Sequence, residues 1–237
     1  MVFAATSRSQ RTSILRAMLG WAAILLGLVA VAYSFALRWT PSKTDFAQQG
    51  PMLNDANGTV NWPQLAASNP DFVYLVATTG AQERSTEFAR NRDAAVKEAI
   101  PYGVGHHYSM CEQATDQSTN FDTFVPRDPA ALPPVVILDF DAACRMPPTR
   151  ALIISELTTF LNQIEAHMGK PAIVSPSPEF EERYRISSAI NRTLWLRRNF
   201  FVPDYAARPW VMWQANAHYR AAGVTGAVRW NVMAGRK

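Results

Sequence analysis

A short apolar run between two prolines and two carboxylates constrains the fold of this chain more than any other stretch. Residues 132–144 have the sequence LPPVVILDFDAAC. An apolar run of this length, bounded by proline and polar residues, is typical of a buried strand. Because side chains alternate along a strand, Asp139 and Asp141 are expected on the same side as Ile137. The strand either presents two acids to a site or simply ends in polar residues where it leaves the core.

Residues 17–37 form an uncharged apolar segment near the N-terminus. Roughly 20 apolar residues suffice to cross a bilayer as a helix, and this segment reaches that length. It is longer than the apolar core of a signal peptide, although Ala30-Val31-Ala32 keeps cleavage open as an alternative. Three arginines precede the segment and Arg38 and Lys43 follow it, a charge bias that favours a cytoplasmic N-terminus.

The chain is therefore expected to have four parts along its 237 residues. They are a cytoplasmic N-terminus (1–16), a transmembrane helix (17–37), a linker (38–46) and one folded domain (47–237). The domain would lie in the periplasm or outside the cell, held at the inner membrane by the helix, and it is long enough to bury a full core. The net charge of +4 comes partly from the arginines beside the helix, so it does not indicate nucleic-acid binding.

Strand and helix patterns alternate through the domain. The expected strands are one within 49–62, then 71–80, 103–109, 132–144, 171–175, 193–196, 210–214 and 226–231. The expected helices start near Trp62 and then cover 83–100, 114–124, 150–167 and 178–184. Alternation with such short connections indicates a parallel α/β sheet or barrel, and about eight strands favour a closed barrel.

Apolar periodicity predicts the buried face of the two clearest helices. For 83–100 the predicted inner residues are Phe88, Ala95, Val96 and Ile100. For 150–167 they are Leu152, Ile153, Leu157, Phe160, Leu161 and Ile164.

Both cysteines, Cys111 and Cys144, belong to the folded domain. An even number of cysteines in an oxidising compartment permits a disulfide, and the alternative is two unrelated buried thiols. Each cysteine lies just beyond the expected end of one of two neighbouring strands. A disulfide joining two loops at the same end of the sheet is therefore the prediction.

Several short motifs follow one another along the domain in a fixed order. They are Gly50, Gly58 and Trp62, then Phe72-Val73, Ala77-Thr78 with Gly80, Gly105-His106-His107-Tyr108, Leu132-Pro133-Pro134-Val135, Trp195, Trp213-Gln214 and Gly226-Ala227-Val228-Arg229-Trp230-Asn231. Together they resemble the lysozymes of glycoside hydrolase family 25, which cleave the glycan strands of peptidoglycan. The resemblance implies a TIM-like barrel of five β/α units closed by three strands, with acids at the carboxyl ends of strands and no cofactor.

The positions where the family carries its acids hold different residues here. The first-strand Asp falls on Met52, and the Lys and Glu of the second strand fall on Val76 and Thr79. Without a gap, the Asp-x-Glu pair falls on Ile137 and Asp139, and the late-strand Asp falls on Arg229. A single gap would instead place the pair on Asp139 and Asp141.

Asp139 and Asp141 are thus the candidate catalytic residues. Glycoside hydrolysis normally requires one acid to protonate the leaving oxygen and a second group to act on the sugar or on water. Met52 and Ile137 can do neither. The resemblance therefore implies a membrane-anchored, lysozyme-like domain that acts on or binds peptidoglycan, with catalysis weakened or lost. The alternative is an active muramidase that uses Asp139, or Asp139 with Asp141.

Positions that are aromatic in the family more often keep an aromatic residue here than its acidic positions keep an acid. Flat apolar side chains can stack on sugar rings, whereas most buried aromatic residues simply fill the core. Candidate substrate-binding residues, aromatic and polar, are Trp62, Tyr108, Trp195, Trp213, Gln214 and Asn231.

Two other kinds of site find little support in the sequence. His106 and His107 are adjacent, so on a strand they point to opposite faces and cannot easily bind one metal ion. Residues 135–141 superficially resemble the Asp-x-Asp strand of haloacid dehalogenase-type phosphatases, which would use Asp139 and Asp141. That motif continues with Thr or Val where Ala143 stands, and the remaining motifs do not fit its order.

Overall fold

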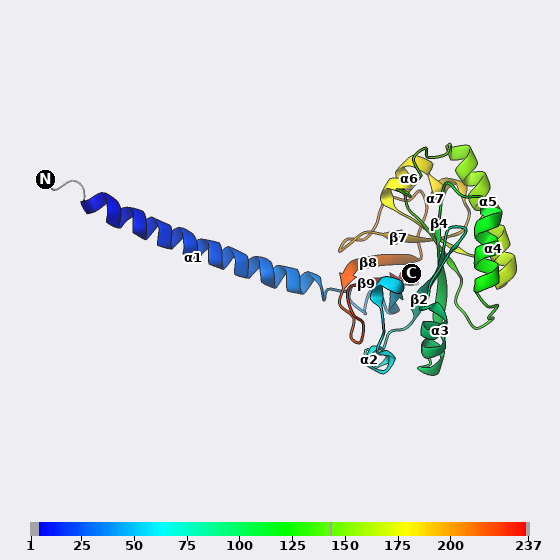
Figure 1. Ribbon diagram of the computed structural model, residues 1–237, viewed down its shortest axis with the longest axis horizontal. Coiled ribbons are helices and arrows are strands. Elements are labelled where there is room, and N and C mark those ends of the chain that lie inside the picture. Colours follow the sequence, from blue (N-terminus) through cyan, green and yellow to red (C-terminus); the bar gives the residue numbers. More distant parts are fainter. Residues whose placement is uncertain (1–4, 143, 236–237) are drawn as a thin grey trace. The chain divides into compact units, whose positions relative to one another are not determined.

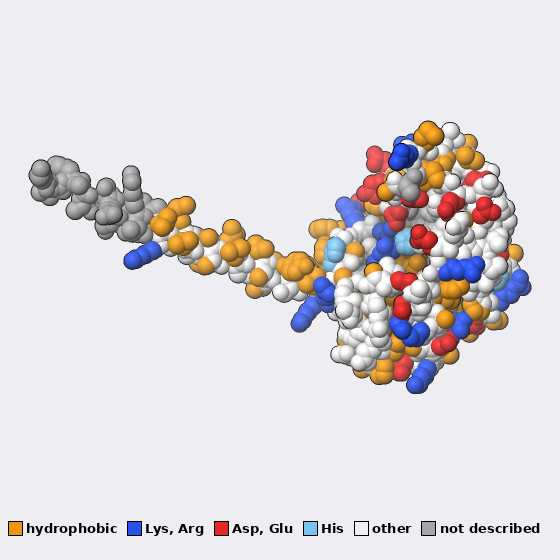
Figure 2. Space-filling model, in the orientation of Figure 1, with side chains coloured by type: hydrophobic (Ala, Val, Ile, Leu, Met, Phe, Trp, Pro, Cys, Tyr) orange, Lys and Arg blue, Asp and Glu red, His pale blue; other side chains and the backbone are white. Residues whose placement is uncertain are grey.

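The computed structural model describes residues 5–142 and 144–235, so the first four residues of the expected cytoplasmic N-terminus lie outside the described part. The chain divides into two units, residues 1–39 and 40–237. The first contains helix α1 (Ala5–Ala36). Its stretch Leu15–Ala36 has a mean hydropathy of 2.0 and is long enough to cross a membrane, a test that a signal sequence also passes. Apolar side chains cover this stretch in Figure 2.

The second unit is built on one closed sheet (Figure 1). Its barrel strands are β1 (Gln49–Leu53), β2 (Val73–Thr79), β4 (Tyr102–Tyr108), β5 (Val135–Leu138), β6 (Ile173–Pro176), β7 (Thr193–Arg197), β8 (Met212–Tyr219) and β9 (Val228–Met233). Neighbours from β1 through β8 run parallel, and β9 is antiparallel to both β8 and β1. Since β1 pairs with β2 on one side and β9 on the other, the barrel closes, which confirms the predicted fold class.

Helices follow the first five barrel strands and are absent, among the described residues, between the last three. They are η1 (Asp55–Asn57), α2 (Trp62–Ala66), α3 (Phe88–Lys97), α4 (Ala114–Phe124), α5 (Arg150–Met168), α6 (Pro178–Tyr184) and α7 (Ile186–Ala189). Local chemistry sets the limits of α5: the Thr149 side chain caps its N-terminus, and Gly169 ends it in the left-handed conformation.

The structure corrects the predicted region 83–100 in two respects. Glu83–Arg84 form a short strand, β3, that pairs antiparallel with β2, so α3 begins only at Phe88. Val96 is 59% exposed, because the buried face of α3 runs through Phe88, Asn91 and Ala95. Leu152 of α5 is likewise 50% exposed. Both residues lie at the margin of an apolar stripe, where periodicity alone does not separate buried positions from solvent-facing ones.

Apolar side chains fill the barrel interior. Met52, Tyr74, Val76, Ile137 and Trp195 are among its members, and all are buried. Backbone space is tight here: a Cβ atom on Gly103 would lie 2.3 Å from the ring of Tyr74, so only glycine fits this position. The charged side chains of Asp139 and Arg197 lie at the carboxyl ends of β5 and β7, where the barrel opens.

Candidate active site

Asp139 and Arg197 form the central ion pair at the carboxyl ends of the parallel strands. Asp139 directly follows β5, and Arg197 is the last residue of β7. Nη1 and Nη2 of Arg197 donate to the two carboxylate oxygens of Asp139 at 2.9 and 2.8 Å. Nη2 also donates to the Leu138 carbonyl at 2.8 Å. Two parallel charge-assisted bonds of this kind fix both position and orientation of the carboxylate.

This ion pair determines the protonation state of Asp139. Partial burial alone would raise the pKa of Asp139, but the hydrogen bonds and the charge of Arg197 outweigh it. His107 and Arg229 act in the same direction, and the pKa ends below its ordinary value. The carboxyl group therefore stays ionised at neutral pH, whereas a general acid must hold a proton under working conditions.

The other acid positions of the resemblance contribute no acid beside this ion pair. Met52 and Ile137 are 5% and 1% exposed and belong to the apolar barrel interior. Arg229 on β9 pairs in register with Met52, and its Nη1 lies 3.8 Å from the Met52 sulfur. The centre of the barrel mouth therefore has an apolar floor with two arginines and one carboxylate above it.

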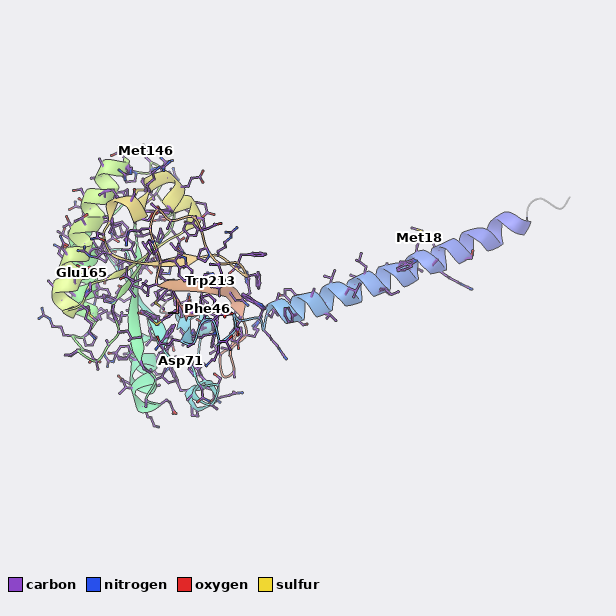
Figure 3. All side chains as sticks on the ribbon, turned by 180° about the vertical axis from the view of Figure 1, so that it is seen from behind. Met18, Phe46, Asp71, Met146, Glu165 and Trp213 are labelled. Carbon is purple, nitrogen blue, oxygen red and sulfur yellow. A yellow bond between two sulfur atoms is a disulfide. The ribbon has the colours of Figure 1, made fainter. Side chains whose placement is uncertain are left out.

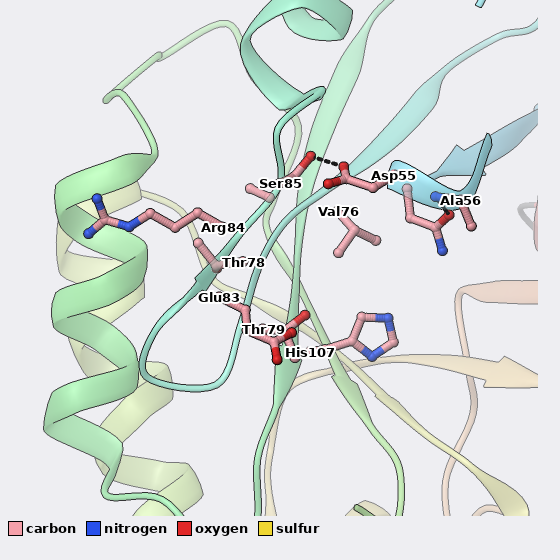
Figure 4. Close-up of a pocket in the computed structure, with 11 residues that line it drawn as sticks. Asp55, Ala56, Val76, Thr78, Thr79, Glu83, Arg84, Ser85 and His107 are labelled. Carbon is pink, nitrogen blue, oxygen red and sulfur yellow. Dashed lines mark hydrogen bonds between the residues drawn. The ribbon is translucent and has the colours of Figure 1, made fainter. Parts of the chain in front are cut away.

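Two adjoining cavities open beside this centre. The larger, about 610 Å³, is lined by Glu83, Tyr108, Glu112, Asp139 and Asp141 among others. The smaller lies between the ends of β1 and β2. In Figure 4, Val76 lies between Asp55, which accepts a hydrogen bond from Ser85, and His107. Thr79, Glu83 and His107 line both cavities, which together form one groove along the barrel mouth, called the mouth groove below.

Asp141 lies on the wall of the mouth groove beside a disulfide. Its Oδ2 accepts a hydrogen bond from Ser109 Oγ at 3.1 Å. Cys111 and Cys144 are bonded, with their Cα atoms 5.6 Å apart. They join the loop after β4 to the loop after β5, which confirms the predicted disulfide and its placement at one end of the barrel.

The adjacent histidines face in opposite directions. His106 is fully buried between the rings of Phe121 and Phe160, outside the barrel. His107 lines the mouth groove, and burial together with the nearby arginines lowers its pKa to about 4 despite Asp139. No cluster of three or more His, Cys, Asp or Glu side chains suited to a metal ion occurs among residues 5–142 and 144–235.

The six predicted substrate-binding residues are all buried, and they do not come together at the mouth groove. Tyr108 lines its larger cavity, with its ring against Phe160. Trp195 lies inside the barrel, where its ring meets Tyr74 edge to face at 4.8 Å. The Trp62 indole donates to Asn91 on α3.

The remaining three lie on β8 and β9. Trp213 packs against Phe46 of the predicted linker, as Figure 3 shows, and donates to the Arg198 carbonyl. Asn231 donates to the carbonyl groups of Gly50 and Arg229. Gln214 pairs in register with Asn231 across the two strands.

Arg197, Glu83 and Glu112 belong to the site but were not predicted. Arg197 could have been found from its place at the carboxyl end of an expected strand, where barrel sites form. Glu83 was expected on a helix, and no signal marked Glu112.

Comparisons with known proteins agree on one family. The sequence model of glycosyl hydrolases family 25 matches residues 53–224. A family 25 glycosyl hydrolase from Bacillus anthracis is similar in structure, with a TM-score of 0.76 and 23% sequence identity, covering 84% of this chain and 94% of that one. A bacterial lysozyme from Streptomyces coelicolor has a TM-score of 0.70 and 20% identity, covering 79% and 92% of the two chains.

The spore cortex lytic enzyme SleM from Clostridium perfringens is also similar, with a TM-score of 0.64 and 19% identity, covering 82% of this chain and 69% of that one. A comparison with curated protein sequences found no significant match.

Proposed function

The chain belongs to glycosyl hydrolase family 25, and from this premise we propose that it is a membrane-anchored domain that binds peptidoglycan glycan strands, with muramidase activity lost or strongly weakened. The bidentate ion pair between Arg197 and Asp139 carries the proposal. In the alignment without a gap, Asp139 is the one carboxylate that remains at the family's acid positions. The ion pair with Arg197 keeps this carboxylate ionised. Family membership also leaves no basis for the phosphatase alternative.

The apolar floor below the ion pair supports loss of catalysis. Cleavage of a glycosidic bond passes through a transition state with positive charge on the sugar, which a second carboxylate stabilises or attacks. Ile137 and Met52 offer methyl, methylene and thioether groups at those positions. Arg229 adds positive charge where the transition state develops it, which is electrostatically unfavourable.

An active enzyme remains the alternative, because Asp139 and Asp141 line the same cavity. One assay distinguishes a peptidoglycan-binding domain without activity from an active muramidase. The full chain, purified in detergent, is incubated with peptidoglycan, and new reducing ends and co-sedimented protein are measured. We expect co-sedimentation without reducing ends above those of an Asp139→Asn variant.

The control for this assay is Asp204→Asn, since Asp204 is 82% exposed and its ion pair, among the described residues, is with Arg198. Release of reducing ends that Asp139→Asn or Asp141→Asn abolishes, and Asp204→Asn does not, would establish the active enzyme. Failure of the chain to sediment with peptidoglycan would remove the binding function.

The N-terminal helix and the disulfide support a place at the inner membrane with the folded domain (47–237) outside the cytoplasm. Leu15–Ala36 comprises 22 residues, and at 1.5 Å per residue these cover the roughly 30 Å hydrocarbon core. A disulfide such as Cys111–Cys144 persists in oxidising compartments.

An intact-mass measurement on protein extracted from membranes tests this arrangement. We expect the full 26.4 kDa chain, lighter by two hydrogens until reductant is added. Cleavage after Ala32 would shorten the product by residues 1–32 and turn the anchor into a signal sequence. Two alkylated cysteines without reductant would contradict the oxidising location.

A further inference from the structure

Arg229 is a half-buried cation without a carboxylate partner. Its Nη1 lies 3.8 Å from the sulfur of Met52. None of the ion pairs formed by the described residues includes it. Asp139, the nearest acid in electrostatic terms, already has both oxygens bonded to Arg197. Among the described residues, Arg197 and Arg229 at the barrel mouth therefore share the single carboxylate of Asp139, which is hydrogen-bonded to Arg197.

The surroundings of Arg229 make its positive charge unfavourable for the stability of the folded protein. Burial, and then the charge of Arg197, lower the pKa of Arg229, against a smaller opposite effect of Asp139. Nε of Arg197 is also buried without a hydrogen-bond partner. Removing a guanidinium from water without pairing it costs free energy, and an anionic ligand would recover that cost.

The mouth groove limits which anion can enter. Arg229 pairs in register with Met52 near the carboxyl end of β1. Asn54 and Asp55, which follow β1 directly, line the smaller cavity, so Arg229 lies at the groove end of β9. The rim of the larger cavity carries Glu83, Glu112 and Asp141. These acids repel a polyanion such as a polyphosphate, yet they accept hydrogen bonds from sugar hydroxyl and amide groups.

We propose that Arg229 binds the single carboxylate of an otherwise uncharged sugar, and that the acidic rim binds the hydroxyl groups of the same glycan. Within peptidoglycan this chemistry matches the lactyl carboxylate of muramic acid. That group is free only where the stem peptide has been removed, so an amide-cleaving reaction must supply the ligand. The inference rests on the proposed function for the choice of peptidoglycan as the source.

Monosaccharide titration of the full chain in detergent tests the site without the polymer. N-acetylmuramic acid and N-acetylglucosamine differ by the lactyl group alone, so calorimetry of the two isolates its contribution. We expect N-acetylmuramic acid to bind about tenfold or more tightly, the range of a charge-assisted hydrogen bond. Arg229→Gln should abolish the difference, and Arg229→Lys should restore part of it. Arg198→Gln, on an arginine 44% exposed and paired with Asp204, should leave it unchanged.

Equal affinity for the two sugars, or a preference that survives Arg229→Gln, would overturn the inference. Tight binding of muramyl dipeptide, whose lactyl group is amidated and whose carboxylate lies on the peptide, would overturn the choice of the lactyl group. Thermal unfolding adds an independent measurement: unliganded Arg229→Met should be at least as stable as the native chain, and a clear loss would show a hidden partner. The titration uses no polymer, and the co-sedimentation assay uses no monosaccharide. Failure of the carboxylate site is therefore distinguishable from failure of the proposed binding to peptidoglycan.

Discussion

Replacing Trp195 with alanine is expected to lower the free energy of unfolding by about 3–5 kcal/mol, the range for removing a large aromatic side chain from a core. Trp195 is 1% exposed and packs inside the barrel with Tyr74, Ile137 and Met212. Its loss would leave a cavity lined by side chains from several strands. The closed sheet restricts how far those strands can move inward to fill the cavity.

A denaturant titration of the full chain in detergent, followed by near-UV circular dichroism, measures this effect. Phe201→Ala is the matched control, because that aromatic ring is 67% exposed, and it should change stability by less than about 0.5 kcal/mol. The same experiment separates the two interpretations of Trp195. A variant with native stability but reduced co-sedimentation with peptidoglycan would place the residue on the glycan rather than in the core.

Trp195 also illustrates what could not be predicted from the sequence. The alternation of strand and helix patterns was enough to predict a closed barrel, because each apolar run has the length and borders of a buried strand. It was not enough to say on which side of the barrel an aromatic residue lies. Interior, helix-facing and groove-facing positions are all apolar in a barrel wall, so Trp62, Trp195 and Trp213 look alike in sequence and differ only in the fold.

The chemistry of the site was less predictable than its location. Alignment through the Leu132-Pro133-Pro134-Val135 motif assigns Asp139 to the family's Glu position. The expected strand extended past this residue, whereas β5 ends at Leu138, directly before Asp139. The partner that holds it ionised is 58 residues away in sequence, on a strand that reaches β5 only across β6. A pairing of that kind depends on sheet order, and no local pattern in the sequence encodes it.

The substitutions at the family's acid positions together change the sign of the charge at the centre of the barrel mouth. An acidic cluster would stabilise positive charge on a bound sugar. Arg197 and Arg229 with one carboxylate instead favour the binding of an anion. The acids that remain, Glu83, Glu112 and Asp141, lie on the rim of the mouth groove. The proposed loss of catalysis and the proposed recognition of a carboxylate would therefore both follow from one redistribution of charge.

Acidification is expected to destabilise the folded chain through His106. This side chain is 0% exposed, and burial lowers its pKa to about 3, with a smaller opposing effect of the Gln117 hydrogen bond. Above the pKa of about 6.5 for the unfolded state, His106 is neutral in both the folded and the unfolded chain. In this range it contributes no pH dependence to the free energy of unfolding. As the pH falls below 6.5, only the unfolded state takes up the proton, so stability is lost by up to about 1.4 kcal/mol per pH unit until the folded pKa is reached.

Between pH 6.5 and 4.5 this amounts to roughly 2 kcal/mol from His106. The His107 pKa is lowered as well, so a smaller pH dependence should persist when His106 is replaced. Unfolding titrations at several pH values, on the native chain and on His106→Gln, measure the contribution as a difference in slope. Glutamine can accept from Thr78 and donate to Gln117 in place of the imidazole, whose nitrogens meet those groups at 2.8 and 3.2 Å, but it cannot titrate. Because only the slope is compared, any loss of packing at neutral pH cancels. A native slope in His106→Gln would mean that this histidine already takes up its proton in the folded state.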